Sequence, residues 1–259
     1  MLRWSSLAAL LFIGSPALLS ADLLIVEKSL IKSGNRVIVG ARSTYIKGTR
    51  MRIEVTQEGA TTVTVYDLPA GESLELDASK RKAVVRTIST RSAKLEKEYP
   101  RARSTVTLTA TGITKTTAGL ECAEHRFDGR VPITKSGEIA LLLSGIACLA
   151  SADPRAADYA TFAKAAYDQD LVLGRATDNA ILLALVRGQT ELYRALTQQG
   201  GIPLSVDLTT TVEGRGVLAG MVRKPLAGSR ITTASKIEAA TLDDALFAVP
   251  AGWKRELQK

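Results

Sequence analysis

Histidine and cysteine are scarce in this 259-residue chain, and their scarcity excludes several kinds of catalytic site. The chain has one histidine, His125, and two cysteines, Cys122 and Cys148, which are too far apart for a CxxC pattern. One histidine and two separated cysteines cannot form an ordinary zinc site. The sequence also lacks a phosphate-binding glycine loop, a dinucleotide-binding fingerprint and a G-x-S-x-G elbow. We therefore expect no enzyme activity, no metal and no cofactor.

Aromatic residues make up only 5% of the chain, so the core must be built mainly from aliphatic side chains. Hydrophobic residues are 46% and charged residues 23%, as in an ordinary globular protein. No linker, low-complexity segment or sequence repeat divides the chain. We therefore expect residues 22–259 to form a single domain.

No apolar run is long enough to span a membrane, although the chain begins with a short one. Arg3 precedes an apolar stretch at residues 7–13, and small residues stand at positions 20 and 21. This order is typical of a secretory signal peptide. We expect residues 1–21 to direct export to the periplasm of a bacterial envelope, leaving no transmembrane span after cleavage. The alternative is a retained N-terminal anchor.

The formal net charge of +8 at pH 7 could favour an anionic partner such as nucleic acid. The basic residues are spread along the chain, however, and Lys80, Arg81 and Lys82 form its one run of three. We interpret the charge as solubilising, and for an exported protein we expect no nucleic acid partner.

Both cysteines belong to the expected exported part, where the compartment is oxidising. We therefore predict a disulfide between Cys122 and Cys148, formed across a hairpin that turns at about residues 129–137. Such a bond requires Cα atoms within roughly 7 Å of each other. The alternative is a pair of buried free thiols.

Alternating apolar and polar residues predict strands in the first third of the chain, where turn signals such as Ser33-Gly34-Asn35 separate them. From Tyr45 to Val55 the odd positions are mostly apolar and the even positions mostly polar, which is typical of a strand with one buried face. Gly48 interrupts this stretch, which therefore forms two strands or one kinked strand. We expect an antiparallel meander. Residues 90–99 fit a short exposed helix or a loop.

The segment Ile139–Leu149 is apolar on both faces, so as a strand it must be covered on both sides. The alternative is a buried helix. Two amphipathic helices are predicted after it, forming a helical insert at about residues 153–200. Asp153 and Pro154 fit the N-cap and first position of one helix, and the second begins near Thr177 or Asp178. Strands then resume, including one at residues 217–222.

Three local motifs resemble an exported family of unknown function related to the LolA-like lipoprotein-carrier superfamily. Residues 45–54 read YIKGTRMRIE and resemble an early YIKG-x-R-x-R-x-E strand pair of that family. Residues 119–122 read GLEC and resemble its G-Y-x-C strand. Residues 246–253 read LFAVPAGW and resemble its closing LF-x-x-P-x-G-Y segment, with Trp253 in place of tyrosine. The chain departs from the family at residues 150–201, where it carries more helix.

The resemblance implies an α+β fold, in which a curved antiparallel half-barrel has helices covering its concave face. Carriers of this type hold acyl chains between sheet and helices. We therefore expect a non-enzymatic envelope protein that binds a lipid or another hydrophobic ligand. The expected ligand-binding residues are apolar and lie on strands and helices: Met51, Ile53, Val106, Leu108, Leu141, Leu143, Tyr159, Phe162, Leu185 and Leu192.

An alternative hypothesis is a structural or protein-interaction module of the envelope, with a filled core, an envelope protein partner and no ligand. An enzyme would have to use His125 as its general base, but no partner residue is indicated near this histidine. Arg50, Arg52 and Glu54 form a polar row that fits either an anion site or a solvated strand face with cross-strand pairs.

Overall fold

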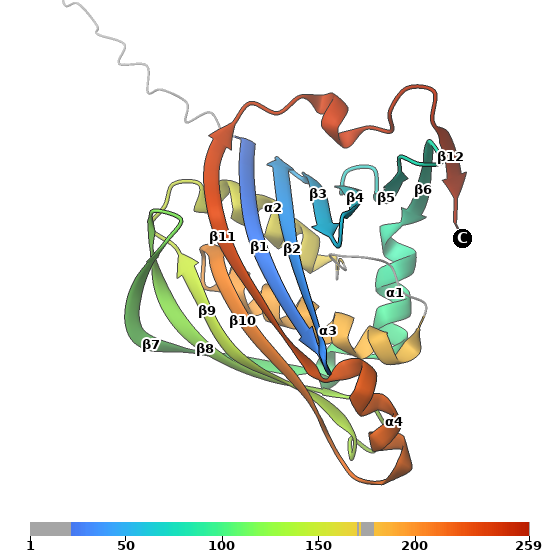
Figure 1. Cartoon of the computed structure of the whole chain (residues 1–259), viewed down its shortest axis with the longest axis vertical. Helices are drawn as coiled ribbons and strands as arrows, with labels where there is room; N and C mark the ends of the chain where they lie inside the picture. The colour runs from blue at the N-terminus through green and yellow to red at the C-terminus, as the bar shows by residue number, and fades with distance from the viewer. Residues whose placement is uncertain (1–21, 170, 172–178, 259) are drawn as a thin grey trace, which may run out of the picture.

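The computed structural model describes residues 22–169, 171 and 179–258 of the chain. The expected signal peptide, residues 1–21, lies outside the described residues. The described residues form one open sheet of 12 strands in the order β12-β6-β5-β4-β3-β2-β1-β11-β10-β9-β8-β7, so that β12 and β7 are its edges. Figure 1 shows that the long central strands are strongly curved. The expectation of an antiparallel-dominated sheet with helices is therefore confirmed.

The first six strands form the predicted antiparallel meander, because short turns separate segments that alternate between apolar and polar residues. The stretch around Gly48 forms two strands, since this glycine adopts a left-handed conformation with a φ of +56° between β2 and β3. The six strands are β1 (Asp22–Ser33), β2 (Arg36–Lys47), β3 (Arg50–Gln57), β4 (Ala60–Asp67), β5 (Glu72–Asp77) and β6 (Lys82–Thr87).

The phase of the alternation changes across this turn. In β3 the buried residues are the odd-numbered Met51 and Ile53, as the sequence indicated. In β2 they are the even-numbered Thr44 and Ile46. The expectation of buried odd positions was therefore wrong for β2, because the two turn residues between the strands change which parity faces the core.

The second half of the sheet is built from five long strands. β9 settles the alternative between strand and buried helix in favour of a strand. It pairs with β8 and β10, while β11 pairs with β1 and so joins the two halves of the sheet. These strands are β7 (Thr105–Thr117), β8 (Leu120–Pro132), β9 (Ala140–Ala150), β10 (Ile202–Glu213) and β11 (Gly228–Ala240).

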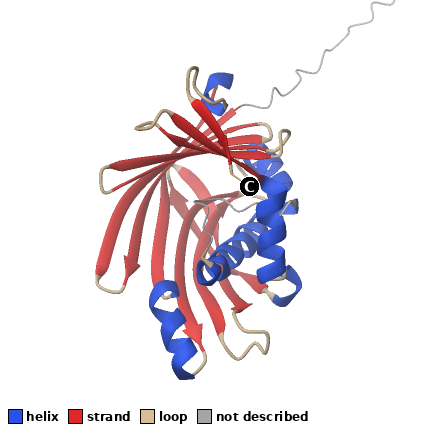
Figure 2. Cartoon of the chain, turned by 90° about the vertical axis from the view of Figure 1, so that its right-hand side faces the viewer, coloured by secondary structure: helices blue, strands red, loops and turns tan. Residues whose placement is uncertain are grey.

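Four α-helices accompany the sheet in the described part of the chain (Figure 2). The first of them settles the alternative between helix and loop at residues 90–99. α2 contacts β1, β2 and β10, α3 contacts β7, β8 and β9, and α2 and α3 contact each other. The helices are α1 (Ile88–Glu98), α2 (Ala156–Asp168), α3 (Ala180–Gln198) and α4 (Gly216–Leu226).

The helix starts differ from the sequence prediction. The N-cap of α2 is Arg155 and not Asp153, whose backbone carbonyl instead accepts a hydrogen bond from the Ala156 amide at 2.9 Å. The predicted start of the second helix at Thr177 or Asp178 lies outside the described residues. In the structure, Asn179 caps α3 by accepting a hydrogen bond from the backbone amide of Ile181 at 2.9 Å.

The predicted strand at residues 217–222 was wrong, because this segment belongs to helix α4. Ala219, Val222 and Leu226 are its buried residues, and their spacing is that of one helical face. The alternation read from residues 217–222 was too short to separate a strand from a helix. A further strand, β12 (Lys254–Leu257), was not predicted, and it pairs with β6 in parallel.

The early and closing motifs of the resemblance meet in the structure. The guanidinium of Arg52 donates a hydrogen bond to the backbone carbonyl of Leu246 at 2.9 Å. Arg50 pairs with Asp244 at 2.6 Å, and its guanidinium lies 5.2 Å from the ring centre of Phe247. The two motifs are therefore parts of one contact, in which β3 holds the short 3₁₀ helix η2 (Asp244–Phe247).

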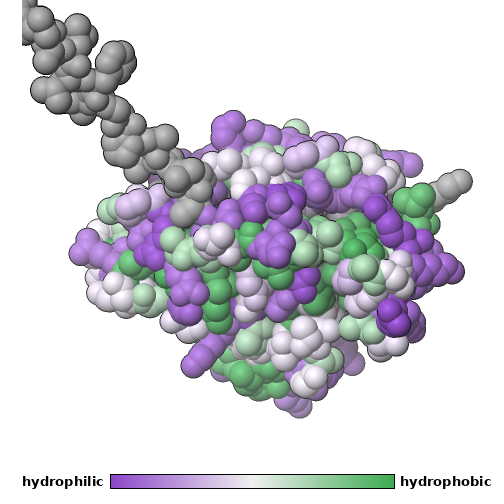
Figure 3. All heavy atoms as spheres, turned by 90° about the horizontal axis from the view of Figure 1, so that it is seen from above, coloured by the Kyte–Doolittle hydropathy of each residue, from purple (hydrophilic) through white to green (hydrophobic). Residues whose placement is uncertain are grey.

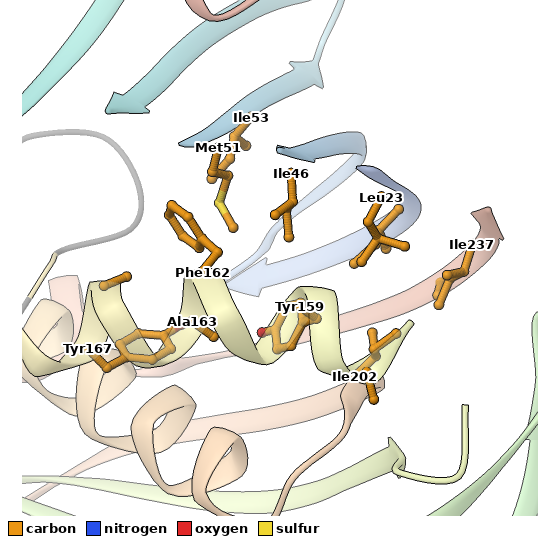
Figure 4. Close-up of a cluster of buried hydrophobic side chains, with 14 of the residues drawn as sticks. Leu23, Ile46, Met51, Ile53, Tyr159, Phe162, Ala163, Tyr167, Ile202 and Ile237 are labelled. Carbon is orange, nitrogen blue, oxygen red and sulfur yellow. The ribbon is translucent and has the colours of Figure 1, made fainter. Parts of the chain in front are cut away.

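The core has two large clusters. One lies between α2 and the strands β1, β2, β3, β10 and β11, and Figure 4 shows Phe162 of α2 pointing toward Met51 of β3. The other lies between α3 and the strands β8, β9 and β10. A smaller cluster centres on Val65 and Phe247. On the face seen in Figure 3, hydrophilic and hydrophobic residues are interspersed.

Candidate functional site

A cavity of about 70 Å³ lies between the sheet and helices α2 and α3. This volume has room for several water molecules or one small polar group. Part of its lining is apolar or aromatic, and Figure 4 shows Met51 on β3 facing helix α2, which carries Tyr159 and Tyr167. The apolar and aromatic lining residues are Ile25, Met51, Tyr159, Tyr167, Val186 and Pro203.

The rest of the lining is polar and partly charged. Tyr193 contributes an aromatic ring with a hydroxyl, and the other polar lining residues are Glu27, Arg42, Thr44, Gln189, Thr190 and Arg230. Three of these side chains carry a formal charge. The cavity is therefore amphipathic, with an apolar wall on one part and a cluster of hydrogen-bonding groups on the other.

The polar groups reach the cavity because they occupy core-facing positions of their strands. Along β1, Leu23 and Ile25 are buried, and Glu27 follows with the same parity. The sheet register places Glu27 opposite Arg42 of β2, and Ile25 opposite Thr44. A cross-strand pair therefore sets a carboxylate beside a guanidinium at a place where the strand pattern would otherwise supply apolar residues.

Glu27 and Arg42 form an ion pair, in which Arg42 Nε lies 3.5 Å from Glu27 Oε2. Burial disfavours the charged guanidinium, but the neighbouring Glu27 carboxylate favours it, and the pKa of Arg42 is raised above its ordinary value. Arg42 is therefore a permanent cation inside the cavity. Arg230 of β11 also lines the cavity, so that two guanidinium groups stand against a single carboxylate among the described lining residues.

The tyrosines of the cavity are held in their neutral form. Burial raises the pKa of Tyr159 and of Tyr167, and the nearby tyrosine Tyr193 adds to the effect in both. Their hydroxyls therefore stay protonated at neutral pH and can donate hydrogen bonds. The same shift opposes a role as general base, because a tyrosine must lose its proton before it can accept one.

The structure divides the expected ligand-binding residues between the two large clusters. Met51 and Tyr159 line the cavity, and Ile53 and Phe162 belong to the same cluster around α2. The remaining six lie in or against the other cluster: Val106, Leu108, Leu141, Leu143, Leu185 and Leu192. The expected set is therefore not one continuous site around the cavity.

Most of the polar lining was not predicted from the sequence. Glu27 and Arg42 were not singled out, and neither was Arg230. The sequence did contain a signal for these residues. A charged residue that falls on the otherwise apolar face of a predicted strand either ends the strand or faces a polar site. Here Glu27 continues the parity of Leu23 and Ile25. The contribution of α3 could not be read from periodicity, since it depends on how the helix is placed against the sheet.

The predicted disulfide is present. Cys122 of β8 and Cys148 of β9 are bonded, with their Cα atoms 5.4 Å apart. The hairpin between these two strands brings them together, as expected, and both side chains are buried in the cluster around α2.

The other candidates from the sequence have ordinary structural contacts. The Nδ1 atom of His125 lies 3.2 Å from the backbone carbonyl oxygen of Ala123. The side chains of Arg52 and Glu54 pair with each other at 2.7 Å, and Arg50 pairs with Asp244. The polar row on β3 therefore fits the structural interpretation better than an anion site. Within the described residues, no group of three or more histidine, cysteine or acidic side chains could hold a metal ion.

No protein-family model matches the chain, and no curated protein matches it in sequence. Solved structures similar to it include a domain described as an outer membrane lipoprotein-sorting protein from Vibrio parahaemolyticus, at 7% identity and a TM-score of 0.31, covering 88% of this chain and 89% of the other. They also include a DUF1329 family protein from Desulfovibrio piger ATCC 29098, at 11% identity and a TM-score of 0.33, covering 89% of this chain and 90% of the other.

A third similar structure is that of PNGF-II, at 12% identity and a TM-score of 0.36. The match covers 92% of this chain and 31% of the PNGF-II chain, so this protein spans about a third of that length. The similar structures include a lipoprotein-sorting domain and a protein of a DUF family, the two kinds of protein that the three sequence motifs resemble. At these identities and TM-scores, no ligand, activity or partner is carried over to this chain.

Among the described residues, no helix is both long and apolar enough to cross a membrane.

Proposed function

We propose that this protein is a non-enzymatic protein of the bacterial cell envelope that binds a hydrophobic or lipid ligand between its sheet and its helices. The observation that carries the proposal is the cavity between the strands around β1 and the helices α2 and α3. Cavities with an apolar wall and a few convergent polar groups are the usual form of a small-molecule site. In this proposal, α2 and α3 form a cover over the concave face of the sheet.

The cavity is too small for an acyl chain, so the proposal requires the helices to move when the ligand enters. Burial of an acyl chain stabilises the complex by about 0.8 kcal/mol per methylene group. A tail of ten carbons therefore gains about 8 kcal/mol, which can offset a modest separation of α2 from the strands. The side chains that would be displaced include Tyr159 and Phe162 of α2, which pack against the strands (Figure 4).

The proposed location is the periplasm, and the disulfide between Cys122 and Cys148 supports it because disulfides persist in oxidising compartments. In the proposed organisation, residues 1–21 are a signal peptide. Residues 22–259 form a single LolA-like domain with a helical insert at about residues 153–200. Binding is preferred to catalysis because the cavity tyrosines are held protonated and His125 does not line the cavity.

Native mass spectrometry of the exported protein, purified from the periplasm without detergent, tests this function. We expect a discrete added mass that organic solvent extracts, or one that appears after incubation with fatty acids or phospholipids. A bare protein mass in both cases would contradict ligand binding.

A matched pair of variants connects any ligand to the cavity. Val186 lines the cavity, so Val186→Phe should fill it and prevent the mass addition. Val217 is 83% exposed on α4, so Val217→Phe makes the same enlargement away from the cavity and should leave the addition unchanged. Equal loss in both variants would mean that the ligand does not bind in the cavity.

The second candidate function is an interaction module with a filled core, and the exposed apolar side chains of α4 favour it. Val217, Leu218 and Met221 are exposed on this helix, and the basic Arg223 and Lys224 follow them. Apolar groups in such a place mark protein contact surfaces. A photoreactive crosslinker at position 221 that captures one envelope protein reproducibly, together with an absence of extractable lipid, would favour this function over ligand binding.

A further inference from the structure

The cavity contains more hydrogen-bond donors than the surrounding protein satisfies. Thr44 and Tyr167 are each only 3% exposed, and neither side-chain hydroxyl has a hydrogen-bond partner among the described residues. The Nε atoms of Arg42 and Arg230 are also buried and form no hydrogen bond with any residue that the structure describes. Buried polar groups in proteins are nearly always hydrogen-bonded, so four unsatisfied groups around one cavity are unusual.

The Glu27 carboxylate does not account for these donors. Its distance of 3.5 Å from Arg42 Nε is that of an ion pair, whereas a charge-assisted N–H···O hydrogen bond is shorter, at about 2.7–2.9 Å. Arg230 has no ion pair with any of the described residues. Arg42 neutralises the charge of Glu27, and no carboxylate of the described lining residues remains to neutralise the positive charge of Arg230.

The four donors come from two strands, β2 and β11, and one helix, α2, and all of them line the same cavity. A group that satisfies them must accept several hydrogen bonds at once. It must also be negatively charged if it is to balance Arg230. A carboxylate or a phosphate has both properties, and guanidinium groups are well suited to bind such anions. Water can accept hydrogen bonds at these positions, but it cannot balance the charge.

We infer that the cavity binds the anionic head group of an amphiphile, a carboxylate or phosphate, through Arg42, Arg230, Thr44 and Tyr167. Its apolar tail then lies against the wall formed by Ile25, Met51 and Val186. This inference rests on the proposed function and narrows it from a hydrophobic ligand in general to an anionic one. Arg230 supplies the uncompensated charge, and the two hydroxyls direct the head group.

The test compares dodecanoate with dodecanol, which has the same tail and a neutral head, by titration calorimetry on the exported protein at pH 8 and low salt. We expect dodecanoate to bind at least tenfold more tightly than dodecanol. Inorganic phosphate, which has no tail, should bind at least tenfold more weakly than dodecanoate.

Variants assign the preference to the cavity. Arg230→Gln should weaken dodecanoate binding about ten- to a hundredfold, because it removes a charge-assisted contact, while dodecanol binding stays within twofold. Tyr167→Phe should also weaken dodecanoate binding, but by less than Arg230→Gln, and it keeps the buried aromatic ring at this position of α2. Glu27→Gln should strengthen dodecanoate binding, since it removes the one negative charge of the lining. Arg126 is exposed on β8, and Arg126→Gln serves as the matched control with no expected effect.

The outcomes separate this inference from the function on which it rests. Equal affinity for dodecanoate and dodecanol would overturn the anionic head group and leave a hydrophobic ligand site standing. Failure of both to bind would overturn both proposals. If phosphate bound as tightly as dodecanoate, the amphiphile inference would be wrong and the ligand would be a free anion. Retained dodecanol binding in Arg230→Gln shows that this variant is folded, so an unchanged dodecanoate affinity in it would refute the role of Arg230.

Discussion

Arg187 of α3 donates a hydrogen bond from Nη2 to Oε2 of Glu96 in α1 at 2.8 Å, and its own side chain is fully buried. The same guanidinium donates through Nη1 to Glu191 at 2.8 Å and through Nε to the backbone carbonyl of Tyr99 at 2.9 Å. These contacts join two helices that are about 90 residues apart in the sequence. The position of α3 over the sheet therefore depends on this one arginine as well as on its apolar face.

Replacement of Arg187 by methionine should lower the free energy of unfolding by about 3–5 kcal/mol, because it leaves the largely buried Glu191 carboxylate and the Tyr99 carbonyl without their cation. Urea unfolding followed by circular dichroism measures the loss. Arg36→Met is the matched control, since Arg36 pairs with Glu58 and both side chains are more than half exposed. The control should lose less than about 1 kcal/mol. Similar losses in the two variants would show that the cluster around Arg187 does not anchor α3.

The disulfide should contribute about 3 kcal/mol to stability, because it closes a loop between residues 26 positions apart and so restricts the unfolded chain. Urea unfolding with and without a reducing agent should show this difference. The double variant Cys122→Ala with Cys148→Ala should not respond to the reducing agent. Titration of two reactive thiols in denatured, unreduced protein would contradict the bond.

The sheet of the first third could be predicted because its local signals agree with one another. Short alternating segments are separated by turns such as those at Gly34 and Gly48, which both adopt left-handed conformations. In such a meander each strand pairs with the next, so local pattern alone decides the order. Cys122 and Cys148 likewise lie on the consecutive strands β8 and β9, and the turn signal predicted at about residues 129–137 is why their pairing could be predicted.

The cavity could not be predicted because it depends on contacts between distant segments. Its lining combines β1, β2 and β3 with β11 and two helices, and no local pattern fixes how α2 and α3 lie against the sheet. The site residues predicted from the sequence are therefore apolar ones such as Leu143, which belongs to the cluster around α3. Glu27 and Arg42 were not among them, because their pairing appears only in the register of β1 with β2. The helix at residues 216–226 was missed because its buried face becomes clear only when Leu226 is included.

The start of α2 should be sensitive to acid through Asp153. This carboxylate accepts hydrogen bonds from Arg155 Nε at 2.7 Å and Nη2 at 2.6 Å, and Arg155 Nη1 donates to the backbone carbonyl of Ile237 in β11 at 2.6 Å. The hydrogen bonds from Arg155 lower the pKa of Asp153 below its ordinary value of 3.8. Its contribution is therefore present above about pH 4 and is lost as the pH falls through the folded-state pKa.

Asp153→Asn should lower the free energy of unfolding by about 1–2 kcal/mol at pH 7, because charge-assisted hydrogen bonds to a mostly buried carboxylate are lost. Below pH 4 the variant and the original protein should converge. Urea unfolding at a series of pH values measures both effects. Asp168→Asn is the control, since Asp168 pairs with Lys164 on the exposed side of α2 and should change stability little at any pH. A difference that stays constant down to pH 2 would contradict the ionic role of Asp153.

The effect of the unsatisfied Thr44 hydroxyl on stability can be measured, because the same threonine-to-valine substitution can be made at two buried threonines, Thr44 and Thr210. Thr210 is 7% exposed, and its Oγ1 donates a hydrogen bond to the backbone carbonyl of Leu226 at 2.6 Å. Thr210→Val should therefore lower the free energy of unfolding by about 1–2 kcal/mol. Thr44→Val should leave it unchanged or raise it, because valine removes a buried hydroxyl that has no partner among the described residues.

Both variants should be measured by urea unfolding of protein from which lipid has been extracted, and then again with dodecanoate. With dodecanoate bound, Thr44→Val should be less stable than the original protein, because the head group accepts a hydrogen bond from the Thr44 hydroxyl only in the original protein. Equal losses from Thr44→Val and Thr210→Val in the extracted protein would show that water already satisfies the Thr44 hydroxyl. The unsatisfied donors would then give no reason to expect an anionic ligand, and the cavity would be a hydrated space between sheet and helices.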